Sequence, residues 1–272
     1  MVRGCQPTDG GNLLLTQGER EQLIKSEPGA KELIRPFSMG AEFIKGVPRY
    51  CIWMDEIDPA VLTKMPLVRE RVASVREFRL ASSKAATRKK ADVPWLFDEV
   101  RPPKSDSYIA FPSVSSGRRK YVPAGFVTTN MIPGNKLFYI DGGDLYVFGI
   151  IASQFHNAWM RQVSGRLKSD FNYSNTIVYN NFIWPDATVE QRGRIEKCVQ
   201  AVLDARAAHS DATLADMYNP DNDFLFPDLM KAHAELDAAV EAAYGVDFGG
   251  DEEKIVAHLF KLYAQKTEAM GE

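Results

Sequence analysis

The pattern of apolar and turn residues changes at Pro185, and this change limits the architectures that the chain can adopt. Before Pro185, short β-prone runs alternate with turn residues and helical patterns. After it, the residues follow helical periodicity, beginning at the cap-like Asp186-Ala187-Thr188. The sequence therefore predicts an α/β (α+β) domain over residues 1–185 and an all-helical domain over residues 186–272.

Two kinds of element are expected in the front domain. Pro66 opens the longest helical pattern, which runs to Pro94 with its arginines largely off the apolar face and its far end projecting beyond the core. Between Ser107 and Tyr146, the runs SYIAFP, RKYVPAGFVTT, KLFYI and DLYVFG predict a small, mainly antiparallel sheet. Further helices are expected over residues 19–26, 29–36, 149–163, 186–209, 227–244 and 252–266, and further strands over residues 49–58 and 176–184.

The composition is that of an ordinary globular protein, with 272 residues, 45% of them hydrophobic. The longest apolar stretch, Leu145 to Ser153, is far too short for a membrane helix, and the N-terminus has no apolar core of a signal peptide. Cys5, Cys51 and Cys198 are scattered, so neither a disulfide framework nor a zinc site is expected. We therefore expect a reducing, cytoplasmic setting.

The net charge of -3 hides a strong separation of charge along the chain. Residues 64–120 hold 14 Lys and Arg against 6 Asp and Glu, whereas residues 186–272 hold 8 against 18. A basic middle followed by an acidic tail predicts a central region that faces a polyanion and a tail that does not. The alternative is a solvated basic helix face.

Several catalytic signatures are incomplete. The stretch NNFIWP, from Asn180 to Pro185, has the asparagine and aromatics of an amino-methylating loop but not its paired prolines. DGGD, from Asp141 to Asp144, is expected between two strands, which is the wrong context for a cofactor loop. The carboxylates of DEID, from Asp55 to Asp58, lack the following Asp and Glu-x-Lys pattern of a metal-dependent nuclease, so no metal site is expected. These patterns predict a chain without a catalytic site.

Basic and polar residues gather in three separate clusters. The loop Ser115–Lys120 combines hydroxyls, a glycine and three cations, which suits phosphate contacts, and an arginine there can pair with a guanine edge. The other two clusters are Arg88, Lys89 and Lys90 at the end of the long helix, and Arg161, Arg166 and Lys168 beside Phe171 and Tyr173. We expect these side chains to converge on one face that fits a nucleic-acid duplex.

Five stretches resemble the C-terminal part of MmeI-like restriction–modification enzymes, in order and over essentially the whole chain. They are VRGCQPTDGGNLLL, LVRERVASVREFRLASSKAATRK, SSGRRKYVPAGF, GRLKSDFNYSNTIVYNNFIWP and AVLDARAAHSDATLADMYNP. In that family one long polypeptide joins an adenine-N6 DNA methyltransferase, often with a nuclease, to a target-recognition domain and a helical C-terminal domain. The resemblance implies that residue 1 is an internal methionine and that the methylating loop lies upstream.

The resemblance also implies roles for the basic clusters. By motif position, the base-reading candidates are Ser83, Lys84, Ser116, Arg118 and Lys120. The DNA backbone candidates are Arg88, Lys89, Lys90, Ser115, Arg119, Arg161, Arg166 and Lys168. The implied partners are double-stranded DNA and the upstream methyltransferase domain of the same polypeptide. No cofactor is expected in this fragment, whereas the parent enzyme uses S-adenosylmethionine, with Mg²⁺ where a nuclease is present.

Two other functions stay open at this point. The chain is a self-sufficient hydrolase if Asp55, Glu56 or His156 belongs to an unrecognised site. It is a scaffold if its acidic helices serve to dock a catalytic domain.

Overall fold

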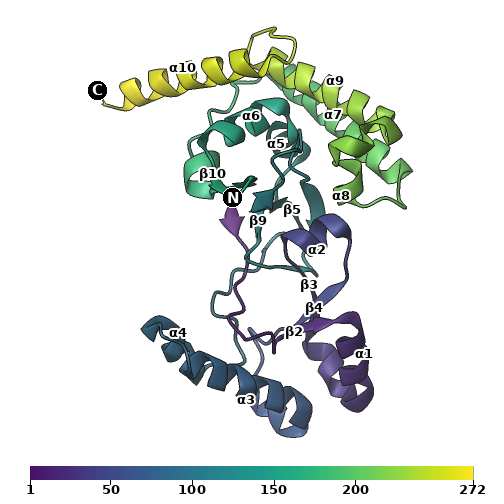
Figure 1. Ribbon diagram of the computed structural model, residues 1–272, viewed down its shortest axis with the longest axis vertical. Helices are drawn as coiled ribbons and strands as arrows, with labels where there is room; N and C mark the ends of the chain where they lie inside the picture. The colour runs from purple at the N-terminus through teal and green to yellow at the C-terminus, as the bar shows by residue number, and fades with distance from the viewer. Residues whose placement is uncertain (272) are drawn as a thin grey trace.

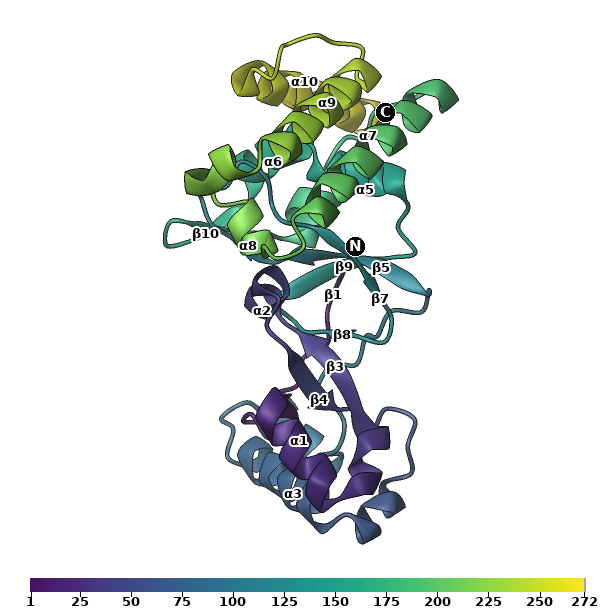
Figure 2. The ribbon, with the colours of Figure 1, turned by 90° about the vertical axis from the view of Figure 1, so that its right-hand side faces the viewer.

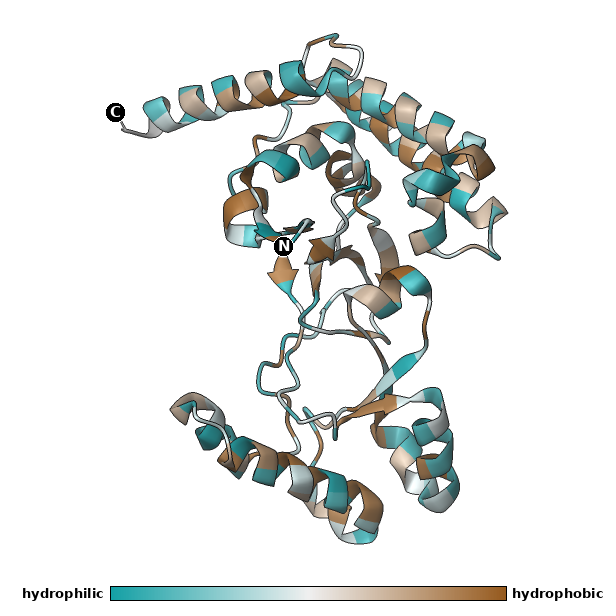
Figure 3. Ribbon diagram, in the orientation of Figure 1, coloured by the Kyte–Doolittle hydropathy of each residue, from teal (hydrophilic) through white to brown (hydrophobic). Residues whose placement is uncertain are grey.

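Buried β-prone residues build the central sheet of the molecule. Every residue of β5 (Ser107–Pro112) after Ser107 is buried, so β5 lies inside the sheet. Its neighbours are β9 (Leu137–Asp141) and β7 (Gly125–Thr128), and β1 (Val2–Arg3) completes the antiparallel order β1-β9-β5-β7. Figure 3 shows the hydrophobic residues of this sheet at the middle of the molecule. The predicted antiparallel sheet is confirmed.

The computed structural model describes the backbone of residues 1–271 and the side chains of residues 1–269. Figures 1 and 2 show an elongated molecule with α1, α3 and α4 at one end, the central sheet in the middle and the C-terminal helices at the other end. The helices are α1 (Gln17–Ser26), α2 (Gly40–Lys45), α3 (Pro66–Leu80), α4 (Ala85–Lys89), α5 (Leu145–Ala152), α6 (Gln154–Val163), α7 (Val189–Ala208), α8 (Leu214–Met217), α9 (Pro227–Ala243) and α10 (Glu252–Gly271). The short helical turns are η1 (Pro28–Leu33), η2 (Pro59–Lys64), η3 (Lys90–Asp92), η4 (Asn175–Tyr179) and η5 (Pro220–Leu225). The mixed fold with a helical C-terminal part agrees with the α+β class expected from the sequence.

Two smaller sheets flank the central one. The second sheet has the order β2-β4-β3-β8, with β2 at Leu14–Thr16, β4 at Arg49–Ile52, β3 at Ile34–Ser38 and β8 at Ile132–Pro133. β8 pairs parallel with β3, and it ties the two sheets together because it lies in the connection from β7 to β9. The third sheet has the order β10-β11-β6, with β10 at Gly165–Leu167, β11 at Asp170–Asn172 and β6 at Val114–Ser115.

The apolar core of the upper part continues across Pro185. Buried residues of β5, α5 and α6 belong to the same cluster as buried residues of α7, α9 and α10. Gly149 of α5 allows close packing, since a Cβ there would lie 2.6 Å from a methyl carbon of Ile195 and 2.8 Å from one of Val199 on α7. A separate cluster joins the second sheet to α1 and α3. The helices after Pro185 therefore complete the core of the sheet before it.

The predicted helix from Pro66 to Pro94 is wrong in its extent. α3 ends at Leu80, and α4 begins only at Ala85. Arg88 of α4 donates from Nη1 to the carbonyls of Ser82 (2.7 Å) and Ser83 (2.8 Å), which lie between the two helices. These bonds satisfy acceptors that a continuous helix would use, in a stretch whose serines favour turns.

Arg79 is also placed differently from the prediction, because its side chain is fully buried and does not lie off the apolar face. Its guanidinium donates to five backbone carbonyls, those of Pro7, Thr8, Lys90, Val93 and Leu96, at 2.7–3.2 Å. The neighbouring apolar side chains of Phe78 and Leu80 are instead 47% and 48% exposed. Arg79 thus joins the N-terminal loop, α3 and the chain after α4.

Three further predictions of secondary structure are corrected. DLYVFG is the start of α5 and not a strand, because the Asp144 carboxylate caps the helix by accepting from Val147 N at 2.8 Å. The segment 176–184 contains the turn η4, where Asn181 Nδ2 donates to the carbonyls of Thr176 and Ile177 and so competes with strand pairing. The segment 29–36 is helical only as η1, and its last residues enter β3.

The described helices include none that is both long enough and apolar enough to cross a membrane.

We predict that Arg79→Lys lowers the free energy of unfolding by on the order of 3 kcal/mol, because one ammonium group cannot satisfy five buried carbonyls. Denaturant unfolding measures this change. Arg76→Lys, at an exposed position of the same helix, is the matched control and is expected to stay within about 0.5 kcal/mol of the parent chain. Equal effects of the two variants would contradict the role of Arg79.

We predict that acidification destabilises the fold through His156. Burial lowers the pKa of His156 to about 3 from 6.5, so the folded state holds the imidazole neutral while the unfolded state protonates it below pH 6.5. Its contribution is therefore complete above pH 6.5 and is lost as the pH falls, at about 1.4 kcal/mol per pH unit. Burial raises the pKa of Asp237 to about 6 from 3.8, which opposes this trend below pH 6.

Urea unfolding from pH 6.5 downwards tests the prediction. His156→Gln is expected to show a shallower loss of stability with falling pH than the parent chain. The same slope in both proteins would contradict it.

Candidate functional site

Two basic loops lie against each other in the upper part of the molecule. One is the loop Ser115–Lys120, which follows β6, and the other is the hairpin of β10 and β11. Gly117 permits their contact, because a Cβ there would lie 2.6 Å from the carbonyl oxygen of Ser169 in the hairpin turn. The fold therefore brings together two of the three basic clusters expected from the sequence.

The hairpin presents its cations to solvent. All three residues of β10 are exposed. The guanidinium of Arg166 lies 3.7 Å from the centre of the Phe171 ring, and its Nη1 donates to the carbonyl of Ser169 at 3.4 Å. Lys168 has a φ of 56°, a left-handed conformation at the turn. Stacking on Phe171 orients Arg166 without neutralising its charge.

Arg118 and Lys120 are exposed but face acidic groups of the C-terminal helices. Arg118 Nη2 lies 2.5 Å from Asp221 Oδ1, and both side chains are more than half exposed. Asp221 raises the pKa of Arg118 through this hydrogen bond. Lys120 Nζ lies 4.0 Å from Asp237 Oδ2 and 5.0 Å from the centre of the Tyr121 ring. The exposed pair of Arg118 and Asp221 contributes little to stability, so another anion can replace the Asp221 carboxylate.

Three predicted DNA backbone residues are less exposed than the others, with Ser115 buried and Arg119 and Arg161 half-buried. Ser115 is buried, and its Oγ has no hydrogen-bond partner among the described residues. Burial lowers the pKa of Arg119, opposed by Asp170. Arg161 donates two hydrogen bonds of 2.7 Å to the carboxylate of Glu252 on α10, and its Nη1 donates to the carbonyl of Lys120 at 2.8 Å. The contacts of Arg161 thus favour a structural role.

The third basic cluster belongs to the other end of the molecule. Ser83, Lys84, Arg88, Lys89 and Lys90 lie on or beside α4, and all five are exposed. Within the described residues, no ion pair within 4.0 Å involves the three lysines of this cluster. In Figure 1, α4 and the β10 hairpin extend toward the same side of the molecule.

NNFIWP is used for packing. Phe182 is buried against His156, with ring centroids 5.0 Å apart, and Asn181 bonds backbone carbonyls of η4. His156 itself is fully buried and hydrogen-bonded to Tyr173 Oη at 3.1 Å. Asp55 and Glu56 line an open groove with Arg35 and Trp53, to which His156 does not contribute. The groups of the hydrolase alternative are therefore not assembled into one site.

The DGGD loop lies between β9 and α5, which corrects the expectation that it joins two strands. Both of its carboxylates bond backbone N–H groups. The Asp141 carboxylate accepts hydrogen bonds from Lys104 N and Ser105 N at 3.0–3.2 Å, and Asp144 caps α5. A Cβ at Gly143 would lie 2.5 Å from Ile109 Cδ1, so the loop approaches the sheet closely at this residue.

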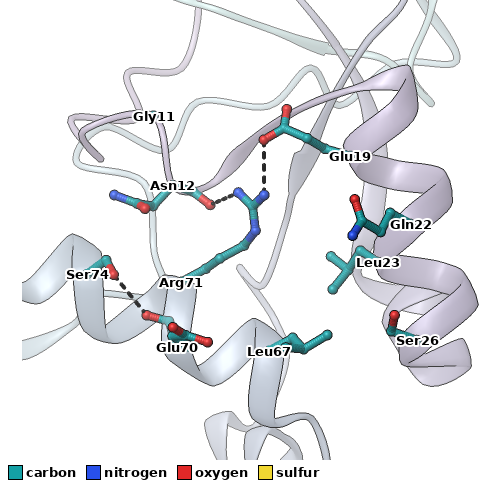
Figure 4. A pocket seen from close by; sticks show the side chains of 10 residues that line it. All are labelled: Gly11, Asn12, Glu19, Gln22, Leu23, Ser26, Leu67, Glu70, Arg71 and Ser74. Atoms are coloured by element: carbon teal, nitrogen blue, oxygen red, sulfur yellow. Dashed lines mark hydrogen bonds and ion pairs between the residues drawn. The ribbon is translucent and has the colours of Figure 1, made fainter.

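A groove between α1 and α3 is lined by polar side chains (Figure 4). Its one arginine, Arg71, donates to the carbonyl of Asn12 at 3.0 Å and pairs with Glu19 at 3.1 Å. These contacts hold α1 and α3 together and use the charge of Arg71. Over the side chains that the structure describes, no cluster of three or more His, Cys, Asp or Glu could hold a metal ion.

The acidic partners of the basic loops were missed by the sequence reasoning. Asp221, Asp237 and Glu252 all come from the acidic tail, for which the sequence predicted no contact with the basic region. The signal that could have found them is the tail's excess of acidic residues, opposite in charge to the middle of the chain.

The fold defines the class of the chain as a mixed α/β part with two basic loops, joined to a helical C-terminal part. It belongs to the MmeI family: the model described as the MmeI target recognition domain matches residues 1–186, and that of the MmeI C-terminal domain matches residues 187–271.

Two relatives agree with this assignment. DNA methyltransferase A of Bacillus subtilis (strain 168) is 36% identical over 266 residues, which are 97% of this chain and 30% of that protein. The solved structure of the Type IIL restriction–modification enzyme MmeI in complex with DNA superimposes with a TM-score of 0.95 at 38% identity, over 98% of this chain and 35% of that one. The chain thus spans about a third of the length of these relatives.

Proposed function

We propose that this chain reads the DNA sequence for an S-adenosylmethionine-dependent adenine-N6 DNA methyltransferase of a restriction–modification system. The observation that carries the proposal is the contact between the Ser115–Lys120 loop and the β10 hairpin, which gathers exposed cations on a chain of the MmeI family. In this proposal residues 1–185 recognise the target and residues 186–272 support them. The chain contributes recognition, and the chemistry belongs to an upstream methyltransferase domain of the same polypeptide.

The division of labour has a physical reason. Methylation of adenine within a duplex requires extrusion of the base into the catalytic pocket. A separate surface must first fix the register of the protein on the duplex and read base edges in a groove. Exposed arginine and lysine side chains on packed loops supply both kinds of contact.

Exposed residues of the clusters, together with the half-buried Ser116, carry the proposed roles. Ser83, Lys84, Ser116, Arg118 and Lys120 are the base-reading candidates. Arg88, Lys89, Lys90, Arg166 and Lys168 are proposed to contact phosphates. Arg161 is bound by Glu252 and by the Lys120 carbonyl, so its proposed contribution to DNA binding is to support the loop. Ser115 and Arg119 stay candidates for contacts with the DNA backbone, although Ser115 is buried and Arg119 is half-buried.

The remaining proposals concern the parent protein. S-adenosylmethionine is proposed to bind upstream of this chain, with Mg²⁺ if a nuclease is present there. A cytoplasmic location is proposed because the protein acts on DNA and because its three cysteines are unpaired, two of them buried.

A matched pair of substitutions tests the function. The chain is incubated with a library of randomised DNA duplexes, and the bound sequences are determined. We expect Arg118→Ala to relax the preference at one or two base pairs, at a cost of about 1–3 kcal/mol for a lost bidentate contact. We expect Lys89→Ala to weaken binding to all sequences alike and to reduce the slope of log K against log salt by about one unit.

Either of two results would contradict the proposal. One is a chain that selects no sequence from the library. The other is an Arg118→Ala variant with the preference of the parent chain, which would remove Arg118 from the base-reading set.

A further inference from the structure

The backbone that follows Arg118 is hydrogen-bonded by helices that come before and after Pro185 in the sequence. Arg161 on α6 holds the carbonyl of Lys120 at 2.8 Å, and Asn157 Oδ1 on the same helix accepts from Val122 N at 2.9 Å. Arg206 Nη1 on α7 donates to the carbonyl of Ala124 at 2.7 Å. The backbone from Lys120 to Ala124 has no regular secondary structure of its own, so these bonds fix its path.

The carboxylate of Asp237 on α9 is the centre of this arrangement. Its Oδ2 accepts from Tyr121 Oη at 2.6 Å, and its Oδ1 accepts from Gln154 N at 2.7 Å. The residue is 8% exposed, and Lys120 Nζ lies 4.0 Å from the same Oδ2. One buried carboxylate therefore joins the start of α6 and the middle of α9 to the recognition loop, by which we mean Ser115–Lys120 and the adjoining segment to Ala124.

A second tie runs through His233, one turn before Asp237 on α9. Its ring stacks on that of Tyr121, with centroids 4.1 Å apart and planes 18° apart. His233 Nε2 is hydrogen-bonded to Tyr218 Oη at 2.7 Å, and Tyr218 Oη accepts from Arg206 Nε at 2.8 Å. Arg206 is thus connected to both ends of this backbone segment. It is linked to the Tyr121 ring through Tyr218 and His233, and it donates directly to the Ala124 carbonyl.

Anchored and exposed side chains are neighbours along the loop. Tyr121 points into the helices and is 3% exposed, whereas the side chain of the adjacent Lys120 is 56% exposed. Base readout requires side chains held within about 0.5 Å of the productive geometry, which a free loop does not provide. The buried contacts of Tyr121 supply that rigidity at the next residue.

We infer that Tyr121 and Asp237 are positioning residues that set base preference without touching DNA. This inference rests on the proposed function, because it concerns the orientation of the loop that carries Arg118 and Lys120. It assigns the acidic helical part a role in specificity, namely to hold the recognition loop in its reading position.

Tyr121→Phe is the variant that tests the inference. It removes the hydroxyl bonded to Asp237 and retains the ring that stacks on His233. Tyr108→Phe is the matched control, because Tyr108 is also buried and its hydroxyl donates to a backbone carbonyl, that of Met131, at 3.0 Å in the sheet. Both variants, Arg118→Ala and the parent chain are taken through the same selection from randomised duplexes. Their affinity for a non-specific duplex and their melting temperatures are measured in parallel.

We expect Tyr121→Phe to lose about fivefold or more in discrimination at the base pairs where Arg118→Ala also changes the preference. Non-specific affinity and its salt dependence are expected to stay those of the parent, and Tyr108→Phe is expected to keep the full preference. If Tyr121→Phe does not fold, Asp237→Asn replaces it with the same expectation, since its single amide oxygen can accept from only one of the two donors in good geometry.

The outcomes separate the two proposals. A parent chain that selects no sequence overturns the proposed function and this inference with it. A parent chain whose preference changes with Arg118→Ala but not with Tyr121→Phe or Asp237→Asn overturns the inference alone. Equal losses of discrimination in Tyr121→Phe and Tyr108→Phe also overturn it, because they would reflect stability and not position.

Discussion

The helices after Pro185 share one apolar core with the sheet before it, and the arrangement of the basic loops depends on this packing. α7 lies close against α5 at Gly149, and α9 packs beside both. This contact brings carboxylates of the acidic tail to the basic loop, where Asp221 meets Arg118 and Asp237 meets Tyr121. The separation of charge along the sequence thus becomes contact between opposite charges in the fold.

The acidic groups divide the basic residues into those whose charge is bound inside the protein and those that stay available to an added anion. Arg161 is bound on both edges of its guanidinium and shapes the loop, whereas Arg118 is held only by an exposed pair that another anion can displace. The lysines around α4 and Lys168 of the β10 hairpin have no ion-pair partner within the described residues. A polyanion would therefore bind these lysines without competition from a carboxylate, and it would compete with Asp221 for Arg118.

Local sequence patterns predicted correctly those helices and strands whose class depends on residues close to them in the chain. Thr188 and Gln191 form a capping box that starts α7 where the sequence placed a cap, and SYIAFP and KLFYI are β5 and β9. DLYVFG was assigned to the wrong class because a short apolar run fits a strand or a buried helix equally well, and the cap at Asp144 decides between them. Arg79 was placed outside because a buried arginine needs acceptors from distant loops, which periodicity does not contain.

The basic residues of the site could be named from composition and family motifs, but their surroundings could not. Tyr121 lies 116 residues from Asp237, and this contact exists only after the core across Pro185 has formed. The most direct test of the account is a structure of the chain bound to a duplex selected from the randomised library. We predict Arg118 and Lys120 within hydrogen-bonding distance of base edges while Tyr121 Oη still donates to Asp237. A complex in which the loop faces solvent, or in which the duplex binds another surface, would contradict the account.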